Sequence, residues 1–359
     1  MTTSITKYLS TQLSTGFSFL TSRRLIAISG PDSTGYLQGA VTGNMSLCTT
    51  KGIYTAFLTA QGRVLNDVFI YPFNEEEGKY KGEPSWLIEV DAEEVESLAQ
   101  RIRRYRLSSR FSIRVLAQAE KGVWSIWDDG AKNLQSSSSL VSRIDKAHRK
   151  EATYLLDQRT PTMGHRLLLP GNKKPDLEMD ECHENYYKLR RYLRGVPEGQ
   201  SEILKEQALP QESNIDFMGG IDYRKGCYVG QELTIRTHHI GVVRKRILPL
   251  QLYSEDDKMP QELTFRCEKA FGVEKIPINT SIEWWQKPGK STGKWLAGLG
   301  NIGLGLCRLA DMTAMKNKDM QENCQATDEF KVKWEADEGI KFVKVKAFTP
   351  SWHNQTTKT

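Results

Sequence analysis

The sequence has few cysteines, and none of them lies close to another. Its six cysteines contain no Cys-x-x-Cys pair. This argues against a zinc ribbon or a self-contained iron–sulfur site, because either needs several ligands brought together. At 359 residues the chain is also too long and too poor in cysteine for a secreted disulfide scaffold. We therefore expect a protein of a reducing compartment.

Long apolar runs are absent as well. The longest, such as Leu167-Leu168-Leu169, are far too short to cross a bilayer, so we expect no insertion into a membrane. No acidic residue precedes Asp32, and residues 1–16 are rich in Ser and Thr but contain no Arg. Two interpretations of this start stay open: a remnant of a mitochondrial transit peptide and an ordinary flexible terminus.

The remaining composition is that of a globular protein. Hydrophobic residues make up 38% and charged residues 26% of a chain long enough for two or three packed units. The net charge of +6 permits an acidic partner without naming one.

The pattern of apolar residues predicts a β/α unit followed by an all-β region. Thr59-Ala60-Gln61-Gly62 is typical of a hairpin turn, Asp91 and Glu94 resemble a capping box, and Gly195 is a common residue after a helix end. The predicted strands cover 25–28, 53–58, 64–71, 86–90, 111–115 and 233–252, and the predicted helices cover 33–38, 91–105 and 181–194. Beyond residue 252, short strands punctuated by Gly and Pro predict a small barrel or sandwich.

The octapeptide Lys225-Gly226-Cys227-Tyr228-Val229-Gly230-Gln231-Glu232 carries the best candidate for chemistry. Nearby cations favour a thiolate at Cys227, and the glycines at 226 and 230 allow a tight, exposed loop. The alternative is that Cys227 is a small buried packing residue, as most unpaired cysteines are. One thiolate is too few for a cluster, so any further ligands have to come from a partner or a small molecule.

Other polar groups have structural alternatives that stay open. Carboxylates and amides could converge on a cleft and bind a heterocycle such as a pterin, or they could simply satisfy turns: Arg63, Asn66, Asp67, Glu212, Asn214, Asp216, Gln231 and Glu232. Two basic groups, at 101–114 and 188–194, fit solvated helix faces better than a nucleic-acid surface. His238 and His239 are adjacent on a predicted strand, so they point to opposite faces and make no metal site.

The octapeptide resembles the signature of the YgfZ family, folate-binding relatives of the glycine-cleavage aminomethyltransferase. That signature is Lys-Gly-Cys, an aromatic residue, any residue, then Gly-Gln-Glu, and every fixed position matches. The resemblance spans most of the chain through further phrases at 30–39, 61–67, 157–166, 194–199, 210–216, 233–246 and 305–309.

The resemblance implies an α+β, aminomethyltransferase-like fold. Two intertwined α/β units would surround a central funnel, with a small C-terminal β-barrel beside them. We expect residues 1–50 and 146–245 to form one split unit, residues 51–145 to form an inserted unit and residues 246–359 to form the barrel.

The flanking phrases look most like the mitochondrial branch of the family, which implies an assembly factor of the matrix. Its partners would be A-type scaffold proteins and 4Fe–4S clients such as aconitase, lipoate synthase and radical-SAM enzymes, and we expect a monomer. Cys227 would contact a cluster transiently, as a shared metal ligand, with Lys225 and Arg236 keeping it ionised. Tetrahydrofolate is a candidate cofactor, with Arg63, Asp67, Tyr228, Gln231 and Glu232 as binding residues.

One departure weakens the case for an enzyme. The aminomethyltransferase has an acidic pair at the end of the hairpin, whereas this chain has Asn66-Asp67. Loss of one carboxylate argues against general-base chemistry, so we expect no aminomethyl transfer on the strength of the fold alone. A folate-dependent one-carbon transferase and a folate-binding protein linked to tRNA modification remain the alternatives.

Overall fold

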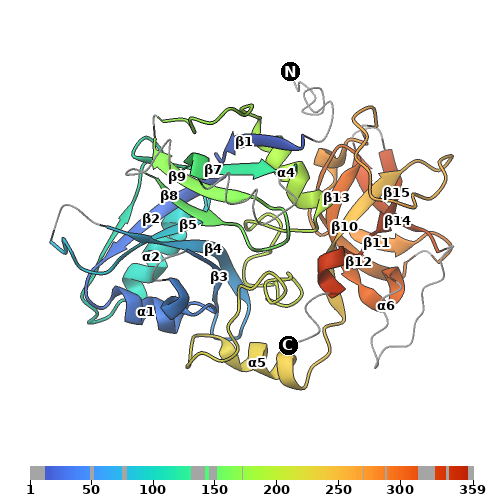
Figure 1. Cartoon of the computed structure of the whole chain (residues 1–359). Helices are drawn as coiled ribbons and strands as arrows, with labels where there is room; N and C mark the ends of the chain where they lie inside the picture. The colour runs from blue at the N-terminus through green and yellow to red at the C-terminus, as the bar shows by residue number, and fades with distance from the viewer. Residues whose placement is uncertain are drawn as a thin grey trace.

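A computed structural model describes residues 13–48, 52–74, 79–130, 142–144, 152–171, 173–269, 271–287, 289–313, 328–336 and 339–354. Figure 1 shows an α/β lobe built from the first two thirds of the chain and, beside it, a barrel built from the last third. In these described residues no helix combines the length and the apolar character that crossing a membrane requires.

Two antiparallel sheets form the α/β lobe. The five-stranded sheet has the order β3-β4-β5-β2-β6, with β2 (Arg23–Ser29), β3 (Ile53–Leu58), β4 (Val64–Phe73), β5 (Ser85–Asp91) and β6 (Ser112–Val115). The four-stranded sheet has the order β1-β7-β9-β8, with β1 (Thr15–Phe19), β7 (Lys121–Asp128), β8 (Thr153–Leu156) and β9 (His165–Pro170).

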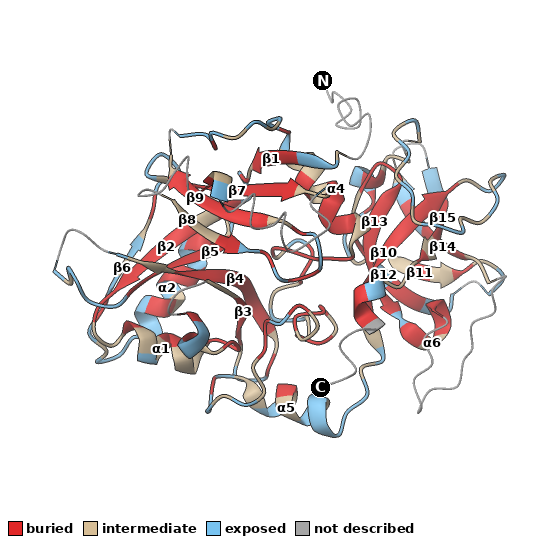
Figure 2. Ribbon diagram, in the orientation of Figure 1, coloured by how far each residue is buried: buried red, intermediate tan, exposed pale blue. Residues whose placement is uncertain are grey.

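The two sheets share an apolar core. Side chains alternate between the faces of a strand, so Ala27 and Phe69 of one sheet meet Trp127 and Leu168 of the other. The opposite face of the five-stranded sheet is covered by α1 (Ser33–Ala40), η2 (Met45–Cys48) and α2 (Val95–Tyr105). Figure 2 shows strands β2, β4, β5, β7 and β9 as mostly buried ribbon, whereas the edge strand β6 is exposed or half-buried.

The C-terminal region is a closed barrel of six strands, which confirms the predicted small β-barrel. Its order is β10-β13-β12-β11-β14-β15, with β10 (Lys245–Tyr253), β11 (Ser281–Trp284), β12 (Ser291–Leu299), β13 (Ile302–Arg308), β14 (Phe330–Ala336) and β15 (Gly339–Ala347). Short helical turns flank it: η3 (Val273–Lys275), α6 (Leu309–Met312) and η4 (Ser351–Asn354). Helix α4 (Glu184–Leu193) packs against the barrel through Leu189 and Tyr192.

The predicted strand over 233–252 is wrong in its first half. Residues Gln231–His239 form helix α5, and only Lys245–Tyr253 is a strand. The β-branched residues Thr234, Ile235 and Thr237 favoured the strand interpretation. Tertiary packing overrides that preference, because Thr234 is buried and Leu233 lies against Gly62 in the turn between β3 and β4.

The predicted capping box before α2 is also wrong. The helix begins at Val95 with Glu94 at its N-cap, and no side chain caps it. Asp91 is used elsewhere: its carboxylate accepts hydrogen bonds from the backbone N–H of Glu93 and, across the fold, of Gln200. Of the predicted apolar face, Val95 and Ile102 are buried, but Tyr105 is half exposed.

The predicted hairpin at 53–71 is confirmed, with Ile53 opposite Ile70. The four strands of the other sheet were not predicted. Strands such as β7 are buried on both faces and lack the alternation that identifies a strand. The division into units stays a prediction, but pairing crosses the expected boundaries. Strand β2, within 1–50, joins β5 and β6, and β7, within 51–145, joins β1 and β9.

Candidate functional site

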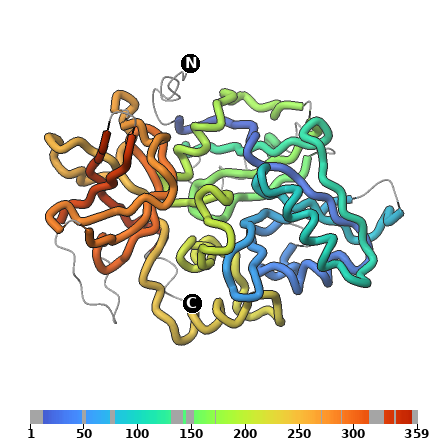
Figure 3. The backbone as a smooth tube through the Cα atoms, turned by 180° about the vertical axis from the view of Figure 1, so that it is seen from behind, coloured from blue at the N-terminus to red at the C-terminus, as the bar shows by residue number. Residues whose placement is uncertain are grey.

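The Lys-Gly-Cys segment is an irregular loop that leads into α5. It is held from one side by the chain after α1: the N–H of Asp222 donates to the carbonyl of Thr42, and the N–H of Val229 donates to the carbonyl of Gly39, each at 3.0 Å. Figure 3 shows this yellow segment beside the blue N-terminal part of the chain, before it crosses to the orange barrel.

Lys225 anchors this loop. Its ammonium donates to three backbone carbonyls, those of Gln38 at 2.6 Å, Val41 at 2.8 Å and Gly43 at 2.7 Å. These groups lie at and just beyond the end of α1, where helix carbonyls lack partners within the helix. Burial lowers the pKa of Lys225 to about 8. All three N–H donors are used, so Lys225 holds the loop and has no donor left for the Cys227 thiol. Its expected effect on that thiol through charge stays a prediction.

Gly230 and Gly62 bring the loop against the β3–β4 turn. Gly230 has a φ of 82°, and a Cβ on it would come within 2.3 Å of the carbonyl oxygen of Thr59. A Cβ on Gly62 would in turn come within 2.9 Å of the carbonyl oxygen of Gly230. Only glycine permits both the left-handed backbone and this approach. Gly226 differs: nothing lies within 4 Å of a Cβ built on it, and its φ is outside the left-handed range.

Cys227 lies at the exposed part of this anchored loop. Of the five cysteines that the structure describes, Cys48, Cys182 and Cys307 are buried, Cys267 is half buried, and only Cys227 is exposed. The sequence had left open a buried packing role for Cys227, and its exposure removes that alternative. A thiol in this position is accessible to a partner.

Side chains of the octapeptide after the cysteine close the loop. Tyr228 is buried in the main core, and the Lys225 ammonium lies 5.2 Å from the centre of its ring. The side-chain oxygen of Gln231 accepts a hydrogen bond from the N–H of Tyr228 at 3.2 Å. Gln231 therefore braces the loop, while Glu232 is exposed in the first turn of α5.

Helix α5 carries the remaining polar residues of this surface. Arg236 is exposed. His238 and His239 are both exposed and lie at the end of helix α5, so the expectation that they point to opposite faces of a strand is wrong. The ring of His238 stacks on Tyr223, with centroids 3.7 Å apart, which draws the end of α5 back towards the start of the Lys-Gly-Cys loop.

The residues expected to bind a cofactor fall into two groups. Tyr228, Gln231, Glu232 and Arg63 lie around the loop and the hairpin turn, where the Arg63 guanidinium donates to the carbonyl of Gln207 at 2.9 Å. Asp67 lies four residues further along β4, about 13 Å at a rise of 3.3 Å per residue, and is fully buried. The structure thus separates Asp67 from the octapeptide.

Asp67 belongs to a buried polar network that sequence reasoning missed. Its Oδ1 accepts from the N–H of Gly199 at 3.0 Å and lies 4.0 Å from the guanidinium of Arg23, and its Oδ2 has no hydrogen-bond partner among the described residues. Burial raises the pKa of Asp67 above its ordinary value, against the pull of Arg23. Arg23 also donates to Glu89 at 2.9 Å.

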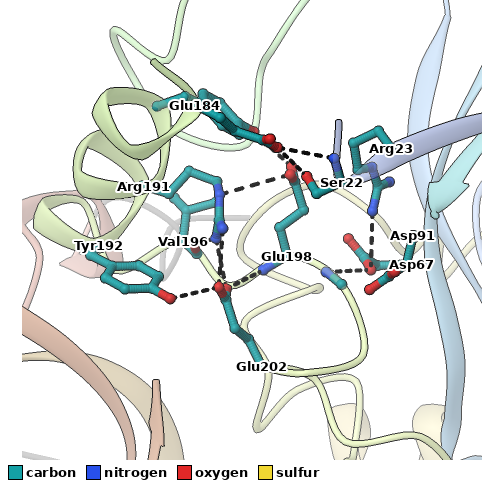
Figure 4. A network of polar contacts seen from close by, with 12 residues as sticks. Ser22, Arg23, Asp67, Asp91, Glu184, Arg191, Tyr192, Val196, Glu198 and Glu202 are labelled. Carbon is teal, nitrogen blue, oxygen red and sulfur yellow. Dashed lines mark hydrogen bonds and ion pairs between the residues drawn. The ribbon is translucent and has the colours of Figure 1, made fainter. Parts of the chain in front are cut away.

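Glu198 is the centre of the other half of the network. Arg159 and Arg166 both contact its carboxylate, as does the hydroxyl of Tyr187 at 2.7 Å. Burial acts to raise the pKa of Glu198, but the surrounding guanidinium groups outweigh it and hold that pKa well below its ordinary value. In Figure 4, Arg191 points towards Glu198 and Glu202. The sequence did contain a signal for this buried network, because the charged Arg166 directly precedes the apolar run Leu167–Leu169.

A polar cavity of about 250 Å³ opens beside this network. Its lining includes Arg23, Lys188, Arg191 and Glu198. Pockets for drug-sized ligands usually measure about 300–1,000 Å³. The cavity therefore has room for one polar ring system rather than for a complete folate.

The other predicted polar residues anchor the barrel. Asp216 forms a bidentate ion pair with Arg246 of β10, both contacts at 2.8 Å, and the Asn214 amide donates to the carbonyl of Ile247 at 2.7 Å. The structural alternative is therefore confirmed for Asn214, which bonds a backbone carbonyl. Asp216 pairs with a side chain instead of satisfying a turn. The basic group on α4 is not a solvated face: Arg190 and Arg191 are buried, and they pair with Asp129 and Glu202.

The barrel and the whole chain have known relatives. A family model described as "CAF17, C-terminal beta-barrel domain" matches residues 244–355. Proteins named "Iron-sulfur cluster assembly factor IBA57 homolog, mitochondrial" match nearly the full chain. The one from Pyricularia oryzae is 47% identical over 349 residues, covering 95% of this chain and 85% of its own. The one from Chaetomium globosum is 43% identical over 369 residues, covering 94% and 83%.

A solved structure shares the fold. The crystal structure of glycine cleavage system aminomethyltransferase T from Bartonella henselae superposes with a TM-score of 0.64 and covers 96% of this chain and 88% of that chain. The sequence identity is 13%, so this likeness shows the fold alone. It confirms the aminomethyltransferase-like α+β fold expected from the sequence.

Proposed function

Because this chain belongs to the IBA57 family of mitochondrial iron–sulfur cluster assembly factors, we propose that it contacts a cluster, or the partner that carries one, through Cys227. Family membership supports a role in assembling iron–sulfur clusters in mitochondria. The observation that carries the finer proposal is the exposure of Cys227 on a loop anchored from two sides. An accessible thiol on a fixed backbone is suited to a transient contact.

The other ligands of such a cluster come from outside the chain. A cluster usually takes four ligands. Among the described residues no group of three His, Cys, Asp or Glu side chains is placed to hold a metal ion. Cys227 thus supplies one ligand of a shared site, and the partner supplies the rest. Arg236 and Lys225 both stay proposed as cations beside the thiol, and Lys225 in addition positions the loop.

The partners we propose are A-type scaffold proteins of the mitochondrial matrix. The clients would be 4Fe–4S proteins of the aconitase, lipoate synthase and radical-SAM classes. The chain would act at the step at which a scaffold transfers or completes the cluster. It would need no turnover of its own for this role.

Reconstitution tests this proposal. The purified chain, an A-type scaffold and an apo-4Fe–4S client are mixed anaerobically with iron and sulfide, and cluster formation is followed by visible absorbance and by client activity. We expect Cys227→Ala to lose most of the yield that the wild type adds, whereas Cys267→Ala, at a half-buried cysteine, keeps it. Full yield with Cys227→Ala would show that the thiol has no such role.

Folate binding is a second proposal, and the cavity beside Asp67 favours it. Asp67 Oδ2 and the Tyr54 hydroxyl are buried without partners among the described residues, and a pterin ring presents donors and acceptors to such groups. Arg23 and Glu198 line the cavity and would contact the ring, and the remainder would extend from the cavity. Asp67 and Tyr54 do not line it, so the ring would reach them only if the cavity opened further inwards. Bound tetrahydrofolate supplies a one-carbon carrier.

Titration calorimetry with tetrahydrofolate tests the folate proposal. We expect binding by the wild type and weaker binding by Lys188→Met, because Lys188 lines the cavity, with Lys275→Met as the matched control at an exposed lysine. Equal binding heats for all three proteins, or no binding heat from any of them, would contradict the folate proposal. Release of a one-carbon product in the same mixture would instead favour the one-carbon transferase.

A further inference from the structure

The segment between α5 and β10 is apolar and exposed. It comprises Ile240, Gly241, Val242, Val243 and Arg244, and its side chains of Ile240 and Val242 are 84% and 42% exposed. Figure 2 shows the end of α5 and the start of this segment in the colour of exposed residues. Clusters of exposed aliphatic residues on a soluble protein often mark an interaction site.

The backbone of this segment is open. The N–H groups of Ile240 and Gly241 complete the last turn of α5, and the carbonyl of Arg244 accepts from Leu309. Within the described part of the chain, the N–H groups of Val242 and Val243 have no hydrogen-bond partner. Pairing with β13 begins only at Lys245, opposite Arg308. The segment is thus an unpaired extension of β10 with residues of high β-propensity, the kind of edge to which another strand adds.

The charge around this segment has one sign. Arg224, Arg236 and Arg244 are exposed, and so are the two histidines of α5. Between Arg224 and Arg244 the sequence has a single acidic residue, Glu232. Complementary charge steers association and selects partners, so a partner strand with acidic side chains fits this surface.

This segment and Cys227 belong to one surface. Helix α5 separates them by nine residues, about 14 Å at a rise of 1.5 Å per residue. The stacking of His238 on Tyr223 ties the end of that helix to the residue four positions before Cys227. Val229, two residues after Cys227, is also 43% exposed.

We propose that Ile240–Arg244 is the docking strand for the cluster-carrying partner, which adds an edge strand with acidic side chains to it. The inference rests on the proposed function of Cys227 and gives that site its partner surface. Successive N–H groups of an extended chain point to opposite edges, so the partner strand bonds to the main chain at Val242. Ile240 and Val242 cover its apolar side chains, and Arg236 and Arg244 select its charge.

Hydrogen exchange and calorimetry on the full chain with an apo-A-type scaffold test the inference. We expect the amide of Val242 to become protected in the complex, while that of Val243, which points to the opposite edge, does not. Val242→Pro removes one of these N–H groups and should weaken binding about tenfold. Val242→Thr keeps the N–H and the shape and should stay within about threefold. Ile240→Glu should weaken binding as well, and it does not constrain the backbone as a proline does.

The outcomes separate this inference from the function on which it rests. The docking strand is overturned if Val242→Pro and Ile240→Glu bind the scaffold as tightly as the wild type and the Val242 amide stays unprotected. This holds even if Cys227→Ala loses cluster assembly. Protection of the Val242 amide and weaker scaffold binding by the two variants support the docking strand, even if Cys227→Ala assembles clusters fully. In that case only the proposed role of the thiol is wrong. A wild-type chain that does not bind the scaffold overturns the docking strand.

Discussion

The carbonyl oxygen of Thr59 occupies the place where a side chain on Gly230 would have to lie, since a Cβ built on Gly230 comes within 2.3 Å of it. Through this contact the turn between β3 and β4 fixes the loop that carries Cys227. The two segments are 171 positions apart in the sequence (230 − 59), so the loop's shape depends on the folded lobe.

Gly230→Ala should therefore destabilise the chain. The substitution meets a carbonyl oxygen and places a Cβ at a φ of 82°, which together should cost about 1–3 kcal/mol in the free energy of unfolding. Gly226→Ala is the matched control, because nothing lies within 4 Å of its Cβ, and it should stay within about 0.5 kcal/mol. Urea unfolding measures both. Equal effects of the two variants would show that the contact with Thr59 does not constrain the loop.

Lys225→Met should loosen the Lys-Gly-Cys loop. It removes three hydrogen bonds from a charged donor, each worth about 1.5–3 kcal/mol when the donor is charged, and leaves the carbonyls of Gln38, Val41 and Gly43 without that partner. We expect faster amide exchange over residues 222–230 and lower stability. Lys275→Met, at an exposed lysine of η3, should change neither. Unaltered exchange in the Lys225 variant would contradict the anchoring role.

Glu198→Gln should lower stability in a pH-dependent way. The folded pKa of Glu198 lies well below that of the unfolded chain, so its contribution is fully present above the unfolded value of about 4.3 and is lost as the pH falls through the folded value. At pH 7 breaking this buried network should cost about 3–5 kcal/mol. The difference from the wild type should shrink in acid. Glu274→Gln, at an exposed position, is the control, and a difference that persists unchanged to low pH would contradict the assignment.

Iodoacetamide should label Cys227 first in the native protein. It is the exposed cysteine of the five described, Cys267 is half buried, and Cys48, Cys182 and Cys307 are buried. Peptide mass spectrometry over a time course should give labelling in the order Cys227, Cys267, then the buried three only after unfolding. Protection of Cys227 in the free chain would contradict its exposure.

Some of the fold could be read from the sequence because the information is local. The hairpin of β3 and β4 follows from alternation and from the turn at 59–62, and the end of α4 follows from Gly195, whose φ is 68°. The octapeptide identified the loop, its cysteine and the family, and the short strands after residue 252 predicted a small barrel or sandwich.

Other features were decided by contacts between distant residues. Helix α5 forms because Leu233 packs against the β3–β4 turn and Thr234 is buried, although the local sequence favours a strand. Lys225 binds carbonyls at and just beyond the end of α1, and Asp67 faces Arg23 instead of the octapeptide. Local sequence specifies turns and the pattern of burial, whereas the partner of a buried charge is set by whichever strand the sheet brings to it. That is why the sequence named Cys227 as the reactive candidate, and only the tertiary structure decided how its loop is held.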